Sequence, residues 1–276
     1  MSSKYYKITI KEENLHQEIN DYLWKLGCMG IEEQETHVEF FFQGQQIEIE
    51  KLVRLIKTTF HANTIHSVDV VADKNWNQIW ESNFHPIQLR DYCVVYAPFH
   101  SIDFSLTKHA ILITPEMAFG TGHHATTRMM IDLMSDINLE GKVVMDFGSG
   151  TGILAILAKK EKASEIVAVE HDEHPFHVMK QNLVNNQCAE VVSVHGTITD
   201  VKNQSFDVIV ANITRNVLLE NKQEMYDRLT GGGLLLCSGY LVDDQNKIVD
   251  EFEALGMQVI QTLQKNNWSS AIFRKQ

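Results

Sequence analysis

The stretch Val143–Gly152 reads Val-Val-Met-Asp-Phe-Gly-Ser-Gly-Thr-Gly and decides the fold class. Its apolar start predicts a strand, its alternating glycines predict a turn, and the residues after Gly152 predict a helix. Glycine has no Cβ, so a turn built from it lets a ligand approach the backbone closely. A second predicted strand, 165–169, leads to Glu170, 22 positions after Gly148. A carboxylate there can accept hydrogen bonds from both hydroxyls of a ribose, so the sequence predicts an adenosine-containing cofactor bound at Glu170.

The spacing of the glycines separates two kinds of cofactor. Dinucleotide-binding turns follow Gly-x-Gly-x-x-Gly and set a helix N-terminus against a pyrophosphate. Here the order is Gly148-x-Gly150-x-Gly152, and Asp146 stands two residues before the first glycine. A carboxylate would repel a pyrophosphate, whereas S-adenosylmethionine carries a cationic ammonium and sulfonium. We therefore expect S-adenosylmethionine, with contacts at Asp146, Gly148 and Gly150. A nicotinamide cofactor and a tight turn without a ligand are the alternatives.

Length and composition bound the class of protein. A chain of 276 residues, 44% of them hydrophobic, is compatible with one or two soluble domains with a real core. The sequence shows neither a long apolar run nor the apolar core of a signal peptide. Its four cysteines are far apart and form no Cys-x-x-Cys pattern, which indicates free thiols in a reducing compartment. We expect a cytoplasmic monomer without a membrane partner.

The charge balance bears on partners. With 24 Lys and Arg against 36 Asp and Glu, the formal net charge is −12. Binding to a nucleic-acid backbone needs clustered basic residues, so no direct nucleic-acid partner is expected. An acidic protein can attract a basic protein substrate over long range. Solubility alone accounts for the charge equally well.

Residues 1–72 read as a small α/β unit. Strands are predicted at 5–10, 31–42 (as a pair) and 67–71, and helices at 13–26 and 47–60. The order β-α-β-β-α-β suggests a ferredoxin-like fold. Because no catalytic constellation is evident in it, we interpret this unit as a substrate-recognition domain.

Residues 73–86 form the predicted linker. Trp76, Trp80 and Phe84 recur every four residues, which places them on one face of a helix. A hinge helix packed against a neighbouring domain is the favoured interpretation. An aromatic platform that binds substrate is the alternative.

Residues 87–276 alternate strands with helices, and we predict that they form the catalytic domain. Strands are predicted at 89–96, 110–114, 143–146, 165–170, 190–195, 206–211 and 233–238, and helices at 126–135, 153–160, 175–186 and 215–229. This pattern is typical of a doubly wound, Rossmann-like α/β domain. The tail, 258–274, reads as a hairpin that adds an antiparallel edge, as in S-adenosylmethionine-dependent methyltransferases.

The loop 119–127, Phe-Gly-Thr-Gly-His-His-Ala-Thr-Thr, precedes the first helix of this domain. The hydroxyls of Thr126 and Thr127 can cap that helix, and they can also meet the carboxylate or ammonium of the cofactor. Phe119, Thr126 and Thr127 are therefore predicted cofactor contacts. A capped helix behind a glycine loop is the alternative, and the two roles can coexist.

Polar residues also follow two later strands. Asn212 comes directly after the predicted strand 206–211, where strand ends face the ligand crevice of such a sheet. Its amide can accept a hydrogen bond from an incoming amine and turn the lone pair of the nitrogen toward the methyl group. Asn212 is thus the predicted catalytic residue and a cofactor contact, with a plain turn asparagine as the alternative. After the preceding strand, Ile198 or Thr199 could lie against an adenine and Asp200 could accept from its amino group; a plain loop fits equally well.

Two groups of histidines raise the question of metal binding or general-base catalysis. His171, His174 and His177 recur every three residues, but Pro175 suits the first position of a helix, and residues three apart there share one face. No metal site is predicted. The pair 123–124 provides two histidines that could act as a general base, and no residue stands out as one that must.

Four segments together resemble one family, the PrmA family of bacterial methyltransferases of large-subunit ribosomal protein eleven. They are 119–127, 145–154, 169–172 and 211–213. The Phe-Gly-Thr-Gly loop followed by paired threonines is the most specific of these marks, and the resemblance covers nearly the whole chain. It implies methylation of lysine side chains and of the N-terminal α-amine of that ribosomal protein. It also implies cofactor contacts at Thr127, Gly148, Glu170 and Asn212.

The chain departs from the family pattern at three places. The family usually has Thr-His-Pro at 123–125, where this chain has His-His-Ala, and it usually has Asp at Glu170 and Cys at Ser149. Glutamate should still reach a ribose, and the serine is a benign change. Two other functions stay open: a methyltransferase of another protein or a small-molecule amine, and a non-catalytic regulator that binds an adenosine ligand.

Overall fold

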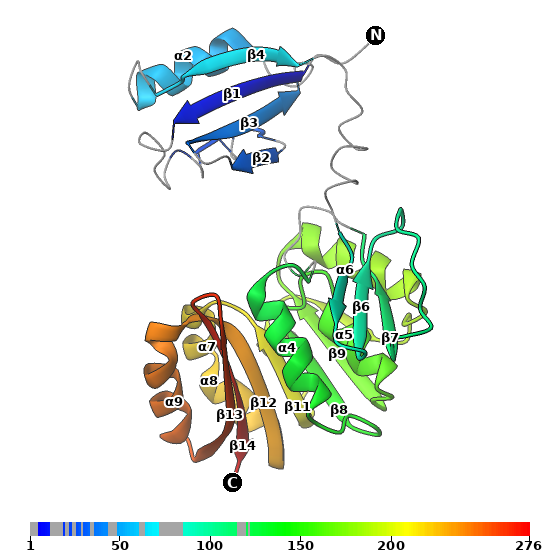
Figure 1. The fold of residues 1–276 in the computed structure, drawn as a ribbon. Coiled ribbons are helices and arrows are strands. Elements are labelled where there is room, and N and C mark those ends of the chain that lie inside the picture. Colours follow the sequence, from blue (N-terminus) through cyan, green and yellow to red (C-terminus); the bar gives the residue numbers. More distant parts are fainter. Residues whose placement is uncertain are drawn as a thin grey trace. The chain divides into compact units, whose positions relative to one another are not determined.

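The chain forms two compact units, residues 1–84 and 85–276, each described here by itself (Figure 1). The computed structural model describes residues 5–11, 19, 22–23, 26–28, 30–33, 36–43, 49–60, 64–71, 85–114, 120 and 122–276. Trp76, Trp80 and Phe84 of the predicted linker lie outside these residues. Across the ranges just given, no helix combines the length and the apolar character needed to cross a membrane.

The first unit contains a four-stranded antiparallel sheet in the order β2-β3-β1-β4. Its described elements are β1 (Tyr5–Lys11), β2 (Gly30–Glu33), β3 (His37–Gln43), α2 (Ile49–Thr59) and β4 (Ser67–Val71). Ile8 of β1 and Phe40 of β3 are paired across neighbouring strands, and both pack in one core with Ile56 of α2. The predicted helix 13–26 lies mostly outside the described residues, so the ferredoxin-like fold stays a prediction.

The second unit is built on a seven-stranded sheet in the order β10-β9-β8-β11-β12-β14-β13. Its strands are β8 (Val143–Phe147), β9 (Glu165–Glu170), β10 (Val192–His195), β11 (Phe206–Asn212), β12 (Leu229–Leu241), β13 (Met257–Lys265) and β14 (Trp268–Lys275). The pairs from β10 to β12 are parallel, and β14 and β13 add an antiparallel edge. The prediction of a doubly wound sheet with a terminal hairpin is confirmed.

Helices cover both faces of this sheet. One face carries α4 (Ala125–Ser135), α5 (Ile153–Lys160) and α6 (Glu173–Asn185), and the other carries α7 (Arg215–Glu220), α8 (Lys222–Arg228) and α9 (Gln245–Glu253). The chain also has two short helical turns, η2 (Ile198–Asp200) and η3 (Val242–Asp244), and Ile198 of η2 packs in the second core. Along β8, Val144 enters the first core and Met145 the second, which is why apolar side chains occupy both faces of this strand. Because β10, β9, β8, β11 and β12 run parallel, the carboxyl ends of these strands lie along the same edge of the sheet.

Two predicted elements differ from the structure. The single strand predicted at 89–96 is two antiparallel strands, β5 (Ile87–Leu89) and β6 (Cys93–Tyr96), and β6 pairs in parallel with β7 (His109–Leu112). Arg90 adopts a left-handed conformation, with φ of 52°, and turns the chain between β5 and β6. The single helix predicted at 215–229 is α7 and α8, separated at Asn221. At the junction the Asn221 side-chain amide donates to the Val217 carbonyl oxygen at 2.9 Å, and the Asn221 backbone N–H donates to the same oxygen at 3.1 Å.

Two further helices correct the prediction. Helix α6 begins at Glu173, so Pro175 is not its first residue. A proline is tolerated there because N–H groups in the first turn have no acceptor within the helix. Helix α9 was not predicted at all, although Ile248 and Phe252 are buried and four residues apart, which is a helical spacing.

Candidate functional site

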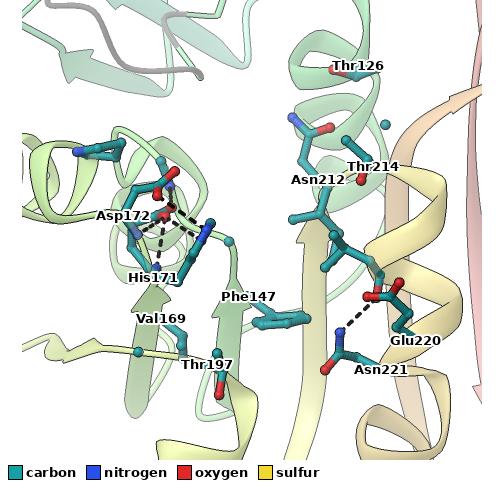
Figure 2. A pocket seen from close by; sticks show the side chains of 18 of the residues that line it. Thr126, Phe147, Val169, His171, Asp172, Thr197, Asn212, Thr214, Glu220 and Asn221 are labelled. Atoms are coloured by element: carbon teal, nitrogen blue, oxygen red, sulfur yellow. Dashed lines mark hydrogen bonds and ion pairs between the residues drawn. The ribbon is translucent and has the colours of Figure 1, made fainter.

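A cavity of about 550 Å³ opens at the edge where β8, β9, β10 and β11 end (Figure 2). This volume is typical of small-molecule sites. Its wall consists of His124, Thr126, Phe147, Gly148, Gly150, Val169, Glu170, His171, Asp172, Pro175, Gly196, Thr197, Asn212, Ile213, Thr214, Val217, Glu220, Asn221, Gly239 and Trp268. Five predicted site residues are among these: Thr126, Gly148, Gly150, Glu170 and Asn212. Thr127 and Asp146 lie behind the wall, and Phe119 lies outside the described residues.

The wall is acidic. Among the residues just named, Glu170, Asp172 and Glu220 carry carboxylates, and none is lysine or arginine. An anionic ligand such as a pyrophosphate would be repelled here, whereas a cationic ligand would be attracted. The charge of the wall therefore favours a ligand with an ammonium or sulfonium group.

The glycine turn after β8 is tied to the end of β9. Gly148 and Gly150 have φ of 73° and 53°, a left-handed conformation that glycine adopts without strain. A Cβ added to Gly148 would overlap the Cγ2 atom of Ile213. The backbone N–H groups of Gly148 and Ser149 both donate to the Val169 carbonyl oxygen, at 2.9 and 3.0 Å. The turn is thus fixed to the end of β9 by two hydrogen bonds, and position 148 has no room for a side chain.

Glu170 is held by backbone donors and keeps one acceptor position. Its Oε2 accepts from the Gly150 N–H at 2.8 Å, and its Oε1 accepts from the N–H groups of His171 and Asp172 at 2.9 and 3.0 Å. The two oxygens of a carboxylate have about four lone-pair positions, so one remains on Oε2 for a ribose hydroxyl. The Gly150 N–H, which would face a pyrophosphate in a dinucleotide turn, is already bound to a carboxylate.

A metal ion is not assigned at this corner of the cavity. Glu170, His171 and Asp172 each present one possible ligand atom, all within 4.8 Å of one another. The Glu170 carboxylate is engaged by three backbone donors, and the other two side chains are exposed. His174 and His177 are exposed on α6.

Asp146 is a buried carboxyl group behind the wall. It is 1% exposed, its Oδ2 accepts from the Ala155 N–H at 3.0 Å, and its Oδ1 has no partner among the described residues. The pKa of Asp146 is raised to about 7, mainly by burial; the Ala155 N–H opposes this shift and the charge of nearby Glu170 adds to it. A cation in the cavity would favour its ionised form.

This pKa leads to a testable pH dependence of stability. The folded pKa of Asp146 lies above its ordinary value of 3.8, so its contribution to stability is complete below that value and is lost as pH rises through about 7. We expect the free energy of unfolding of the ligand-free protein to fall by about 2 kcal/mol more in the wild type than in Asp146→Asn between pH 5 and pH 8. Urea unfolding of both proteins across this range measures the difference, and parallel curves would contradict the assignment.

Asn212 presents an unsatisfied acceptor at the end of β11. Its Nδ2 donates to the Thr127 Oγ1 at 3.3 Å, while its Oδ1 is buried and has no partner in the part of the chain that the structure describes. An unsatisfied buried acceptor costs about 1–3 kcal/mol, and an N–H group of a ligand would remove that cost. Thr127, fully buried in α4, therefore holds the amide in place and does not itself line the cavity.

The first turn of α4 is capped by a histidine. The prediction that Thr126 and Thr127 cap this helix is wrong, because the Nδ1 of His124 accepts from the Thr126 N–H at 3.4 Å and lies 2.8 Å from the Thr126 Oγ1. The His124 ring also meets the Trp268 ring edge-to-face, with centroids 4.8 Å apart. Burial lowers the pKa of His124, which favours the neutral imidazole.

The loop after β10 contributes different residues from those predicted. Ile198 is fully buried in the core, and Thr199 is not part of the wall. The Oδ2 of Asp200 accepts from the N–H and the Oγ1 of Thr197, at 2.7 and 2.9 Å, and so stabilises the loop. Gly196 and Thr197 line the cavity instead.

Sequence reasoning missed part of the wall. Val217 lies on α7 and Trp268 begins β14, and neither belongs to a motif with a local signal. Trp268 is 56 positions after Asn212 in the chain and reaches the cavity only because β14 pairs with β12. Pairing between distant strands was needed to find it.

Comparisons with known proteins agree with this architecture. The family model described as ribosomal protein L11 methyltransferase (PrmA) matches residues 4–276. A protein of that name from Phocaeicola vulgatus is 34% identical over 98% of this chain and 99% of its own length. Another from Porphyromonas gingivalis is 39% identical over 75% of this chain and 72% of its own length.

A solved structure shares the fold. The ribosomal protein L11 methylase from Lactobacillus delbrueckii subsp. bulgaricus superposes with a TM-score of 0.64 and 23% identity, over 70% of this chain and 100% of its own. The family match spans the glycine turn, Glu170 and Asn212. This chain belongs to the ribosomal protein L11 methyltransferase (PrmA) family.

Proposed function

We propose that this protein is an S-adenosylmethionine-dependent N-methyltransferase that modifies lysine side chains and the N-terminal α-amine of ribosomal protein L11. The observation that carries the proposal is the buried, unsatisfied amide oxygen of Asn212, which belongs to the same acidic cavity as the glycine turn and Glu170. Membership of the family supports the substrate, since its curated relatives are named for L11.

The residues of the cavity fit S-adenosylmethionine. Glu170 keeps one acceptor position for a ribose hydroxyl, and its carboxylate is held in place by the backbone N–H of Gly150. The acidic wall and the buried Asp146 carboxyl suit the two cationic groups of this molecule. When bound, S-adenosylmethionine supplies a methyl group that is activated by its positively charged sulfur.

The protein has to position an amine and keep it unprotonated. The amine nitrogen attacks the methyl carbon, so an N–C bond forms while the S–C bond breaks, and the nitrogen then loses a proton to solvent. The Asn212 amide, fixed by Thr127, accepts one N–H and directs the lone pair of the nitrogen. An α-amine, with a free pKa near 8, loses its proton readily, whereas lysine at about 10.4 depends on desolvation in the cavity.

The structure assigns no general base. The Nδ1 of His124 is engaged by Thr126, and His123 is not part of the described wall; its Nε2 lies 3.2 Å from the His85 carbonyl oxygen. Placement of the neutral amine, and not proton abstraction by a side chain, is therefore the main contribution expected of this site.

The proposal is tested by transfer of labelled methyl groups from S-adenosylmethionine to purified L11. Acetylating the amines of L11 beforehand should abolish transfer, because the lone pair of an amide nitrogen is delocalised. Transfer that survives acetylation would show that the acceptor is not an amine.

Removal of residues 1–72 is expected to separate recognition from cofactor binding. The described cavity lies wholly within residues 85–276, a unit with its own two cores. The truncated protein should bind S-adenosylmethionine within about threefold of the full chain while losing most methyl transfer to L11. Calorimetry and the labelled transfer assay measure the two properties. Undiminished transfer would favour a methyltransferase that does not need the first unit to recognise its substrate.

A further inference from the structure

Two groups of wall residues face each other across the cavity. Figure 2 shows His171 and Asp172 on one side, with Asn212 and Thr126 on the other. On the Asn212 side the wall also contains the edge-to-face rings of His124 and Trp268. We define these two rings as the aromatic wall.

Strand pairing and side-chain contacts place the aromatic wall beside Asn212. Trp268 begins β14 and pairs with Leu241 of β12, and on the other side of β12 the residue paired with Asn212 is Ser238. His124 precedes α4, whose Thr127 accepts the hydrogen bond of Asn212. Both rings are thus attached to the elements that fix the Asn212 amide.

A methylated amine presents a recognition problem that Asn212 alone does not solve. Each methyl transfer replaces one N–H by an N–CH₃ group, and the product nitrogen is a cation. A nitrogen that has received three methyl groups keeps its charge and has no N–H left, so the Asn212 oxygen has no donor to accept from. The face of an aromatic ring attracts such a cation without a hydrogen bond, and tryptophan does so most strongly.

We propose that the aromatic wall of Trp268 and His124 binds the methylated, cationic forms of the substrate amine through cation–π attraction. This inference rests on the proposed function, since it concerns the amine that Asn212 receives. The lowered pKa of His124 supports it, because a neutral imidazole does not repel a cation. The wall would hold a partly methylated amine in the cavity between successive transfers.

Two peptides of matched shape test the charge. One carries a single lysine trimethylated at Nε, and the other carries the neutral analogue in which carbon replaces the charged nitrogen. Each is used to inhibit methyl transfer to L11 by the wild type and by Trp268→Phe, Trp268→Leu and Phe176→Leu. Phe176 is the matched control, because it stacks on His195 at 4.8 Å and is absent from the wall described above.

The wild type and Phe176→Leu should be inhibited about tenfold more strongly by the charged peptide than by the neutral one. Trp268→Phe should keep a smaller preference, and Trp268→Leu should lose it. A parallel loss of the higher methylated forms of L11 is expected in Trp268→Leu. Binding of S-adenosylmethionine, measured by calorimetry, checks that the variants fold.

Two outcomes would overturn the proposal. The first is equal inhibition by the two peptides in the wild type, including no inhibition by either. The second is an unchanged preference in Trp268→Leu. If the wild type transfers no methyl group to L11, the proposed function itself fails, and this result is distinct from normal transfer with no preference for charge.

Discussion

Replacing Asn212 by alanine is expected to lower kcat for methyl transfer by about a hundredfold, because positioning contributes several kcal/mol to such a reaction. The amide is the buried acceptor that would receive the amine N–H, and Thr127 fixes its orientation. Stability should change little, since the loss of an oxygen without a partner in the described structure offsets the loss of the hydrogen bond from Asn212 Nδ2 to Thr127.

Asn216→Ala is the matched control for this variant. Asn216 is an exposed asparagine on α7 whose Oδ1 accepts from Arg215, and it is not part of the cavity wall. Its substitution should leave kcat within about twofold. Initial rates with labelled S-adenosylmethionine and thermal unfolding measure both variants. Wild-type turnover in Asn212→Ala would remove this residue from the mechanism.

Replacing Glu170 by alanine is expected to weaken S-adenosylmethionine binding by about a hundredfold. The substitution removes the acceptor for the ribose and three charge-assisted hydrogen bonds to the backbone of Gly150, His171 and Asp172. A single hydrogen bond to a charged group contributes about 1.5–3 kcal/mol, and a hundredfold change corresponds to about 2.7 kcal/mol. Because the glycine turn also loses its anchor, Tm should fall as well.

Glu190→Ala controls for the loss of a carboxylate from the same unit. Glu190 is exposed and pairs with Lys159 at 2.9 Å, outside the described wall. Calorimetry should find its affinity for S-adenosylmethionine within about twofold of the wild type. If Glu170→Ala bound the cofactor normally, ribose recognition by this residue would be wrong.

Elements with a strong local pattern could be predicted from the sequence. Strand 165–170 and helix 153–160 match the structure residue for residue, because apolar runs and a glycine turn mark their ends. The break between α7 and α8 could not be predicted, since residues 215–229 contain no glycine or proline that would mark it. Helix α9 could have been predicted, since Ile248 and Phe252 have the four-residue spacing of one helical face.

The site was predictable where chemistry coincides with the end of a strand. Gly148, Glu170 and Asn212 each follow or end a parallel strand, and strand ends meet at one edge of such a sheet. The placement of Trp268 against the His124 ring depends on a contact between distant segments, and the His124 cap, although local, uses a residue type outside the usual N-cap set. The burial of Asp146 behind the wall likewise emerges only when α5 packs over β8.

The most direct test of the account is the intact mass of purified L11 after incubation with this protein and S-adenosylmethionine. We predict mass gains in steps of one methyl group, with peptide mapping that places every added methyl on a lysine side chain or on the N-terminal α-amine. An unchanged mass of L11, alongside measurable binding of S-adenosylmethionine, would contradict the assignment of the substrate.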